Sequence, residues 1–160
     1  MNGRISAILK GRAAGVEMEA VPSAVLDAGR GLAGDRYYKE TGTFSKKLQG
    51  KPDKEVTLIE SEEIAAFNSN ALLDYPNTVF RRNIVTTGIR LNALVGKEFM
   101  LGKARLKGIR LCEPCSYLAG LLGPEVLRLV VHKCGLRAQV LDSGEIAVGQ
   151  TVALVDPAIG

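Results

Sequence analysis

The spacing of hydrophobic and polar residues predicts a chain built mainly of short strands. Alternating apolar positions rich in β-branched residues and bounded by glycine, proline or aspartate are typical of half-buried strands. In the N-terminal half this pattern marks residues 4–9, a strand pair within 16–27 with a break at Pro22, and the buried run at 55–60. In the C-terminal half it marks 81–89, a hairpin over KEFMLG and KARLKGIRL that turns at Gly102-Lys103, and a final meander of LRAQVL, EIAV and TVALV.

Helical patterns are fewer. Ser61 stands before Glu62 and Glu63, which predicts a helix with the serine as its N-cap and the acids in its first turn. The stretch PCSYLAGLLGPEVLRLVV predicts two short helices divided at Gly123-Pro124. Because strands do not alternate regularly with long helices, a doubly wound sheet is disfavoured. The sequence predicts a mostly β fold: a β-barrel with a few short α-helices packed outside.

Two loops differ from the rest of the chain. AGRGLAGDRYY carries glycines at 29, 31 and 34, next to the charged Asp35 and Arg36, so its path is set by backbone requirements. Residues 42–54 are polar and lysine-rich, and we interpret them as a mobile loop that serves as a lid or a partner surface. No internal repeat or low-complexity tract divides the chain, and residues 1–160 are expected to form a single domain.

Composition narrows the function classes. The 160 residues are 46% hydrophobic and 24% charged, which is ordinary for a soluble globular domain. The net charge of +4 is scattered along the chain, so a small anionic ligand is favoured over nucleic acid. We expect no signal peptide, because MNGRISAILKG turns polar within a few residues, and no membrane span. The three cysteines cannot all pair, which favours a reducing, cytoplasmic compartment.

The cysteines admit three interpretations. The set Cys112, Cys115, His132 and Cys134 has the chemistry of a zinc site, although its His-x-Cys spacing is unusual, and C-x-x-C alone also suits a redox dithiol. Buried packing is the ordinary fate of a cysteine. Cys115 differs, because it follows a proline at the predicted start of a short helix, where the dipole favours a thiolate. Such a sulfur is nucleophilic and able to bind a soft metal.

Several polar residues are candidates to share a site with Cys115. Arg81 and Asn83 are two apart in the predicted strand 81–89 and so share a face, with Arg82 on the other. An arginine beside an amide suits a phosphate or the edge of a fused heterocycle, although a solvated strand edge gives the same pattern. Asp35-Arg36 is either a turn ion pair or a ligand rim. Arg137 is a surface charge or an anion contact, and His132 lacks an evident partner.

The chain resembles the MOSC domain family, named for the C-terminal domain of molybdenum cofactor sulfurases. The matching segments occur in family order: GLAGDRYY (31–38), VTLIE (56–60), FRRNIVTTGIRLNALVGKEFMLGKARL (80–106), CEPC, and CGLRAQVLDSGEIAVGQTV (134–152). The chain departs from the family at Tyr37, where a histidine is common, at Lys133 and Cys134 in the late glycine turn, and at Gln150. It also has no room for the N-terminal portion that supplies cofactor contacts in amidoxime-reducing relatives.

The resemblance implies a β-barrel with a cleft that handles the molybdenum cofactor (molybdopterin) or a related sulfur-bearing group. The family's working cysteine falls on Cys115, as a molybdenum ligand or a persulfide carrier, and its pterin contacts fall on Arg81 and Asn83. We expect Arg36 and Arg137 to line the same basic cleft, with Asp35 at its rim. The implied activities are sulfur transfer or a part in a cofactor-dependent reductase, with a cofactor or a sulfur donor or acceptor protein as partner. The alternatives are a non-enzymatic module that binds the pterin or a protein, and the zinc domain.

Overall fold

Seven strands close into a barrel in the computed structural model, which describes residues 2–42, 45–113, 120, 126–129 and 132–155. The sheet order is β11-β7-β8-β9-β5-β6-β1, and pairing of β1 with β11 closes the ring. The barrel strands are β1 (Asn2–Lys10), β5 (Val56–Glu60), β6 (Ile84–Thr87), β7 (Glu98–Leu101), β8 (Ala104–Leu111), β9 (Leu136–Asp142) and β11 (Thr151–Leu154). The predicted mostly β fold with a barrel is therefore confirmed.

The other strands extend this barrel. The short strand β2 (Glu19–Val21) pairs with the end of β1. A separate three-stranded sheet has the order β10-β3-β4, formed by Gly144–Ala147, Ser23–Asp27 and Gly31–Leu32. Pro22 lies between β2 and β3, as the sequence indicated, because proline cannot donate a ladder hydrogen bond.

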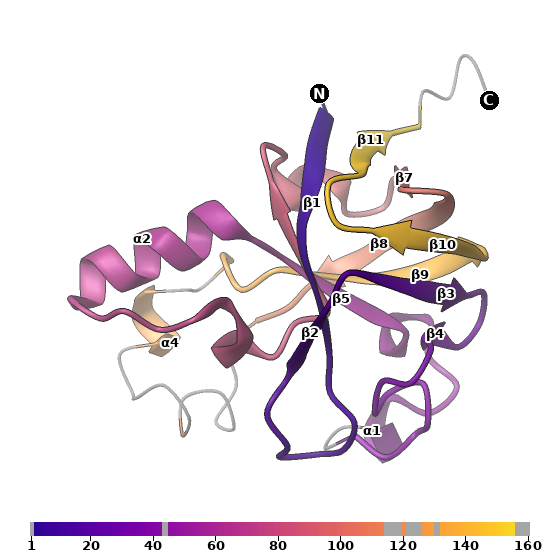
Figure 1. The fold of residues 1–160 in the computed structure, drawn as a ribbon, viewed down its shortest axis with the longest axis horizontal. Coiled ribbons are helices and arrows are strands. Elements are labelled where there is room, and N and C mark those ends of the chain that lie inside the picture. Colours follow the sequence, from indigo (N-terminus) through magenta and orange to yellow (C-terminus); the bar gives the residue numbers. More distant parts are fainter. Residues whose placement is uncertain (1, 43–44, 114–119, 121–125, 130–131, 156–160) are drawn as a thin grey trace.

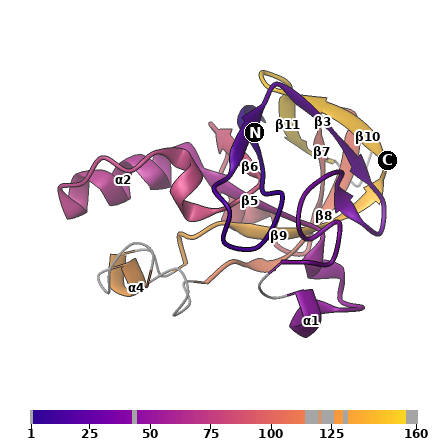
Figure 2. The same cartoon turned by 60° about the horizontal axis from the view of Figure 1, so that its bottom comes forward.

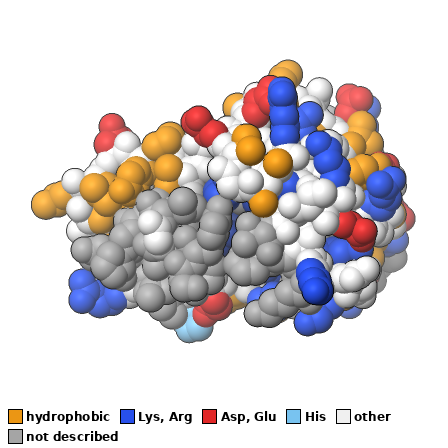
Figure 3. All heavy atoms as spheres, turned by 90° about the horizontal axis from the view of Figure 1, so that it is seen from below, with side chains coloured by type: hydrophobic (Ala, Val, Ile, Leu, Met, Phe, Trp, Pro, Cys, Tyr) orange, Lys and Arg blue, Asp and Glu red, His pale blue; other side chains and the backbone are white. Residues whose placement is uncertain are grey.

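The described helices lie outside the barrel. Helix α2 (Ser61–Ala71) connects the parallel strands β5 and β6 and extends away from the barrel in two views (Figures 1 and 2). The short helices α1 (Ser45–Leu48) and α4 (Val126–Leu129) and 3₁₀ turns at Pro52–Lys54, Asn77–Phe80 and Leu91–Leu94 complete the described elements. Hydrophobic side chains gather at the α2 side of the face in Figure 3. Leu72 and Leu73, which follow α2 in the sequence, are exposed.

Two apolar clusters share strand β5. Leu58 belongs to the cluster inside the barrel, with Ile84 and Phe99, whereas Ile59 belongs to the cluster beneath α2. In that second cluster the rings of Phe67 and Phe80 meet edge to face, with centroids 5.4 Å apart. Burial on both faces explains why residues 56–60 read as an almost continuous apolar run. Each fully buried aliphatic side chain contributes about 1.5–3 kcal/mol.

Three local expectations are wrong. The last three strands do not form a meander, because β10 pairs with β3 while β9 and β11 join different barrel strands. Ser61 is the first helical residue rather than the cap: Glu60 occupies the N-cap position, and the Ser61 hydroxyl hydrogen-bonds Glu62 and Thr87. Arg81 precedes its strand, which begins only at Ile84.

The 42–54 loop contains α1 and a 3₁₀ turn within its described residues. Most of the stretch after Cys112 that was predicted to be helical lies outside the described residues.

A buried carboxylate joins the small sheet to the barrel. Glu55 Oε1 accepts hydrogen bonds from the backbone N–H of Val140 at 2.9 Å and from that of Gly29 at 3.2 Å. Burial raises the pKa of the Glu55 carboxyl above its ordinary value, and the two backbone N–H donors, together with Lys54, oppose that rise only in part. The folded protein therefore binds this proton more tightly than the unfolded chain does.

Replacing Glu55 with glutamine should flatten the pH dependence of stability. Because the folded pKa is raised, the contribution of Glu55 is fully present below the unfolded pKa and is lost as pH rises through the folded value. The free energy of unfolding of E55Q should therefore rise relative to that of the native protein between about pH 4, near the ordinary pKa of a glutamate, and about pH 7. Urea titrations at several pH values measure this difference. An unchanged difference across the range contradicts the assignment.

Candidate functional site

A buried ion pair forms the floor of the site. Arg36 Nη1 lies 3.1 Å from Asp35 Oδ1, and the two residues are only 5% and 0% exposed. The Asp35 carboxylate also accepts the backbone N–H groups of Gly11 at 2.9 Å and Tyr37 at 3.1 Å. A Cβ at position 11 would lie 2.6 Å from Arg36 Nη1, so a larger residue there would displace the guanidinium. The sequence left open an exposed turn pair, and the fold buries it.

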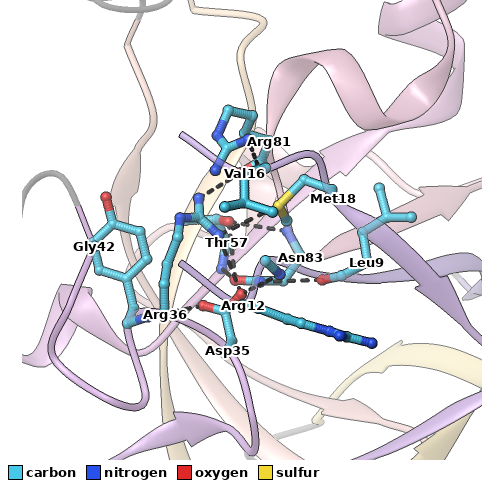
Figure 4. A network of polar contacts seen from close by, with 12 residues as sticks. Leu9, Arg12, Val16, Met18, Asp35, Arg36, Gly42, Thr57, Arg81 and Asn83 are labelled. Atoms are coloured by element: carbon cyan, nitrogen blue, oxygen red, sulfur yellow. Dashed lines mark hydrogen bonds and ion pairs between the residues drawn. The ribbon is translucent and has the colours of Figure 1, made fainter. Parts of the chain in front are cut away.

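Arg36 reaches from the glycine-rich loop to the segment before β6. Its Nη2 donates to the carbonyl oxygen of Arg81 at 3.3 Å, and its Nη1 lies 3.4 Å from the sulfur of Met18. Figure 4 shows the guanidinium directed from the Asp35 side toward Arg81. The ring of Tyr37 lies 4.7 Å from the Arg36 guanidinium carbon, which is a cation–π contact.

Arg81 has a left-handed backbone. It follows the 3₁₀ turn Asn77–Phe80 with φ of +58°, and its N–H closes that turn on the carbonyl of Thr78. The side chain then turns toward the β1–β2 connection, where Nη1 donates to the carbonyl of Val16 at 2.5 Å. Its Nη2 is buried and has no hydrogen-bond partner among the described residues. A buried donor without a partner is costly, so this atom is suited to receive an anion.

Asn83 is a buried clamp between strands. It is 2% exposed; its Oδ1 accepts from the N–H and the hydroxyl of Thr57, and its Nδ2 donates to the carbonyl of Leu9. Its backbone N–H donates to the carbonyl of Thr57, while the N–H of Leu9 donates to the carbonyl of Asn83. Asn83 thus ties the entry of β6 to β1 and β5 and fixes the direction in which Arg81 and Arg82 leave the chain.

Arg82 points toward the other side of the site. Its Nε donates to the carbonyl of Cys134 at 3.0 Å, and its Nη2 lies 3.5 Å from the Cys134 sulfur. The next residue, Gly135, accepts a hydrogen bond from the N–H of Cys112 at 2.8 Å. Arg82 therefore lies beside the end of β8, and this strand ends four residues before Cys115 in the sequence.

Arg137 reaches the same region from β9. It is paired with Thr57 across the antiparallel β5–β9 ladder and with Arg110 across the β8–β9 ladder. Residues directly opposite in an antiparallel pair project from the same face. Since Thr57 is the partner of Asn83, Arg137 belongs to the same face of the sheet. Contacts therefore link Asp35, Arg36 and Arg81, whereas Asn83 and Arg137 are both neighbours of Thr57.

The arginines of this region act on one another. Burial lowers the pKa of Arg36 below its ordinary value; Asp35 opposes the shift, and the positive charges of Arg81 and Arg82 add to it. Three guanidinium groups thus lie within electrostatic reach, and Asp35 is the carboxylate that opposes the shift most. Concentrated positive charge next to a buried donor favours an anionic ligand.

Cys115, the principal candidate from the sequence, lies outside the described residues. Cys112 and Cys134 are buried in the cluster beneath α2 and form no disulfide with each other. Within the described part of the chain, no three histidine, cysteine or acidic side chains are grouped to hold a metal ion. The three described members of the predicted zinc set therefore give that alternative no support.

His132 has a partner that the sequence did not reveal. Its Nδ1 lies 2.8 Å from Glu113 Oε2, and its backbone N–H donates to Glu113 Oε1 at 2.9 Å. Its backbone is left-handed, with φ of +61°, and Asn92 binds its carbonyl oxygen. The roles of Thr57, Arg82 and Glu113 were also missed, because their partners Asn83, Cys134 and His132 are distant in the sequence. The sequence marks Glu113 only by its place between Cys112 and Cys115, which does not indicate a contact with His132.

Comparisons with known proteins agree on the fold. The profile of the MOSC domain family matches residues 45–153. The YuaD protein of Bacillus subtilis superposes with a TM-score of 0.82 at 14% identity, over 96% of each chain. YiiM from Geobacillus stearothermophilus gives 0.75 at 19% identity, over 99% of this chain and 77% of that one. YiiM from Escherichia coli gives 0.65 at 19% identity, over 96% and 70%.

The structural likenesses, at these identities, show a shared fold alone. No curated protein sequence matches the chain significantly. Among the described helices, none is long and apolar enough to cross a membrane.

Proposed function

Because this chain belongs to the MOSC domain family, we propose that it binds the molybdenum cofactor at the arginine cluster, with Cys115 as the working thiolate. The observation that carries the proposal is the buried Nη2 of Arg81, which lacks a partner among the described residues and lies in a region shared with Arg36 and Arg82. A phosphate offers the charge and the acceptor oxygens that such a cluster lacks.

The residues present fit the phosphate of the cofactor. Arg81 would hold it through Nη2, while the buried Asp35–Arg36 pair keeps the carbonyl of Arg81, and hence its backbone, in place. The resemblance to the MOSC family implied that Asn83 contacts the pterin, but its surroundings fit a different role. Its amide is occupied by Thr57 and Leu9, so it positions the arginines rather than contacting a ligand. When bound, the cofactor supplies a redox-active molybdenum centre.

We assign Cys115 as the sulfur donor because β8, the strand before it in the sequence, ends beside the residues that Arg82 contacts. Cys112 is fixed to Gly135, and Gly135 follows Cys134, which Arg82 contacts. Cys115 follows Cys112 by three residues in the sequence. Nearby positive charge stabilises a thiolate, which is the form required of a metal ligand and of a persulfide carrier.

The test is elemental and pterin analysis of protein made in a host that synthesises the cofactor. Wild type should contain molybdenum and pterin. Arg81→Gln should contain about tenfold less bound pterin than wild type, because one charge-assisted hydrogen bond is lost. Cys115→Ser should keep pterin but lose molybdenum. Arg12→Gln is the matched control, since this exposed arginine pairs with Glu19 outside the cluster.

Other outcomes overturn the proposal in favour of a specific rival. Intact mass before and after reductant detects a labile sulfur on Cys115, and such an increment without molybdenum indicates sulfur carriage. Full retention of pterin and metal in Cys115→Ser indicates a binding module. Zinc at about one per chain, lost on replacing Cys112 or Cys134, indicates the zinc domain.

A further inference from the structure

A second polar pocket lies next to the arginine cluster, across the ring of Tyr37. It has a volume of about 200 Å³ and is lined by Gly29, Arg30, Tyr37, Tyr38, Lys39, Glu40 and Lys54. Tyr37 joins the two sites, because its ring lines this pocket and also contacts the guanidinium of Arg36. The pocket is formed by the turn after β3 and the loop before β5. Arg30, Lys39 and Lys54 have no part in the cofactor site proposed for the arginines.

Arg30 is held in place while its hydrogen-bonding edge stays available. Its guanidinium carbon lies 4.0 Å from the centroid of the Tyr38 ring, and Tyr38 is fixed because its hydroxyl donates to Asp27 Oδ2 at 2.8 Å. The guanidinium makes no hydrogen bond or ion pair with any described residue. Stacking on an aromatic face leaves the planar fork free for two parallel hydrogen bonds to an oxyanion.

The charges on the pocket favour an anion with more than one negative charge. Its lining carries the cations Arg30, Lys39 and Lys54 against one carboxylate, Glu40. Glu40 pairs with Lys54 at 3.4 Å and is largely exposed, so a bound oxyanion competes with it for the ammonium group. The Lys39 ammonium donates to the carbonyl of Arg12, which leaves it two further donors.

We propose that this pocket binds the phosphate group of a small soluble molecule, with Arg30 as the bidentate contact and Lys54 as the second cation. The site is separate from the one proposed for the cofactor and goes beyond that function. Its volume accommodates a phosphate and a few further heavy atoms, which favours a small phosphate ester over a large ligand. Glu40 weakens binding by repulsion, so its removal has the opposite effect to removal of Arg30.

The experiment is an amide NMR titration with inorganic phosphate, and in parallel with glycerol phosphate, at constant ionic strength. The amides of Gly29, Arg30 and Tyr38 should shift saturably with both ligands. Arg30→Gln should weaken binding about tenfold, as expected for loss of a bidentate charge-assisted contact. Glu40→Gln should tighten it about twofold through relief of like-charge repulsion.

Matched controls separate this pocket from general charge and from the cofactor site. Lys107→Gln and Glu145→Gln make the same charge changes at exposed positions on β8 and β10, and neither should alter the affinity. Arg81→Gln should leave the shifts of Gly29 and Tyr38 intact whether or not the cofactor proposal holds. Shifts that do not saturate, an Arg30→Gln variant that behaves like Lys107→Gln, or shifts abolished by Arg81→Gln would overturn the inference.

Discussion

Replacing Arg36 with methionine is expected to destabilise the protein by about 3–5 kcal/mol, because it strands a buried carboxylate. Asp35 is fully buried and pairs with Arg36 at 3.1 Å. Methionine retains much of the apolar stem but supplies no charge and no donor to Asp35 or to the carbonyl of Arg81. The free energy of unfolding from urea denaturation measures the loss.

Two further variants show whether the ion pair is the cause. Arg12→Met removes an exposed arginine paired with Glu19 and should cost no more than about 1 kcal/mol. The double variant Asp35→Asn with Arg36→Met should be more stable than Arg36→Met alone, because it removes the stranded charge. A single variant that loses no more stability than Arg12→Met, or a double variant less stable than the single one, contradicts this account.

Replacing Gly135 with alanine should cost about 3 kcal/mol or more, through a positive φ and a backbone clash together. Gly135 has φ of +109°, and a Cβ there would lie 2.0 Å from the carbonyl oxygen of Leu58. The neighbouring backbone belongs to β5 and cannot move aside without disturbing the barrel. Because Gly135 also accepts the N–H of Cys112 and follows Cys134, the contacts of Arg82 should change as well.

Gly149→Ala separates the two causes. Gly149 has φ of +94° and nothing within 4 Å of its would-be Cβ, so alanine there carries the conformational cost alone, about 1–2 kcal/mol. Thermal or urea unfolding of both variants gives the difference that is due to the clash. Equal losses at the two positions would show that β9 and β5 do not constrain each other as closely as the structure indicates.

Local pattern predicted the elements better than it predicted their partners. The strands at 55–60 and 104–111 were evident because period-two alternation and buried apolar runs are local properties. The final meander was wrong because strand pairing is decided by distant residues: Ile146 lies opposite Ala24, which is far away in the sequence. Arg81 was assigned to a strand because nothing in N-T-V-F-R marks the left-handed turn that redirects it.

For the candidate site as well, the sequence suggested residues better than it predicted their contacts. The glycine-rich loop and the F-R-R-N-I segment suggested Asp35, Arg36, Arg81 and Asn83 as site residues. In the structure, contacts link the first three, and Asn83 binds Thr57 and Leu9. Sequence could not distinguish a ligand contact from a clamp at Asn83, because that depends on Thr57 and Leu9 being opposite its amide. The role of Cys115 stays a prediction.

Closure of the ring by β1 and β11 has a kinetic consequence. Gly3 lies opposite Val152, so the last seam joins residues almost a full chain length apart. Such a contact has a large loop-closure entropy and is among the slowest to form. During synthesis the first strand emerges long before β11, so the edge of β1 that pairs with β11 stays open even after β6 has paired with the opposite edge.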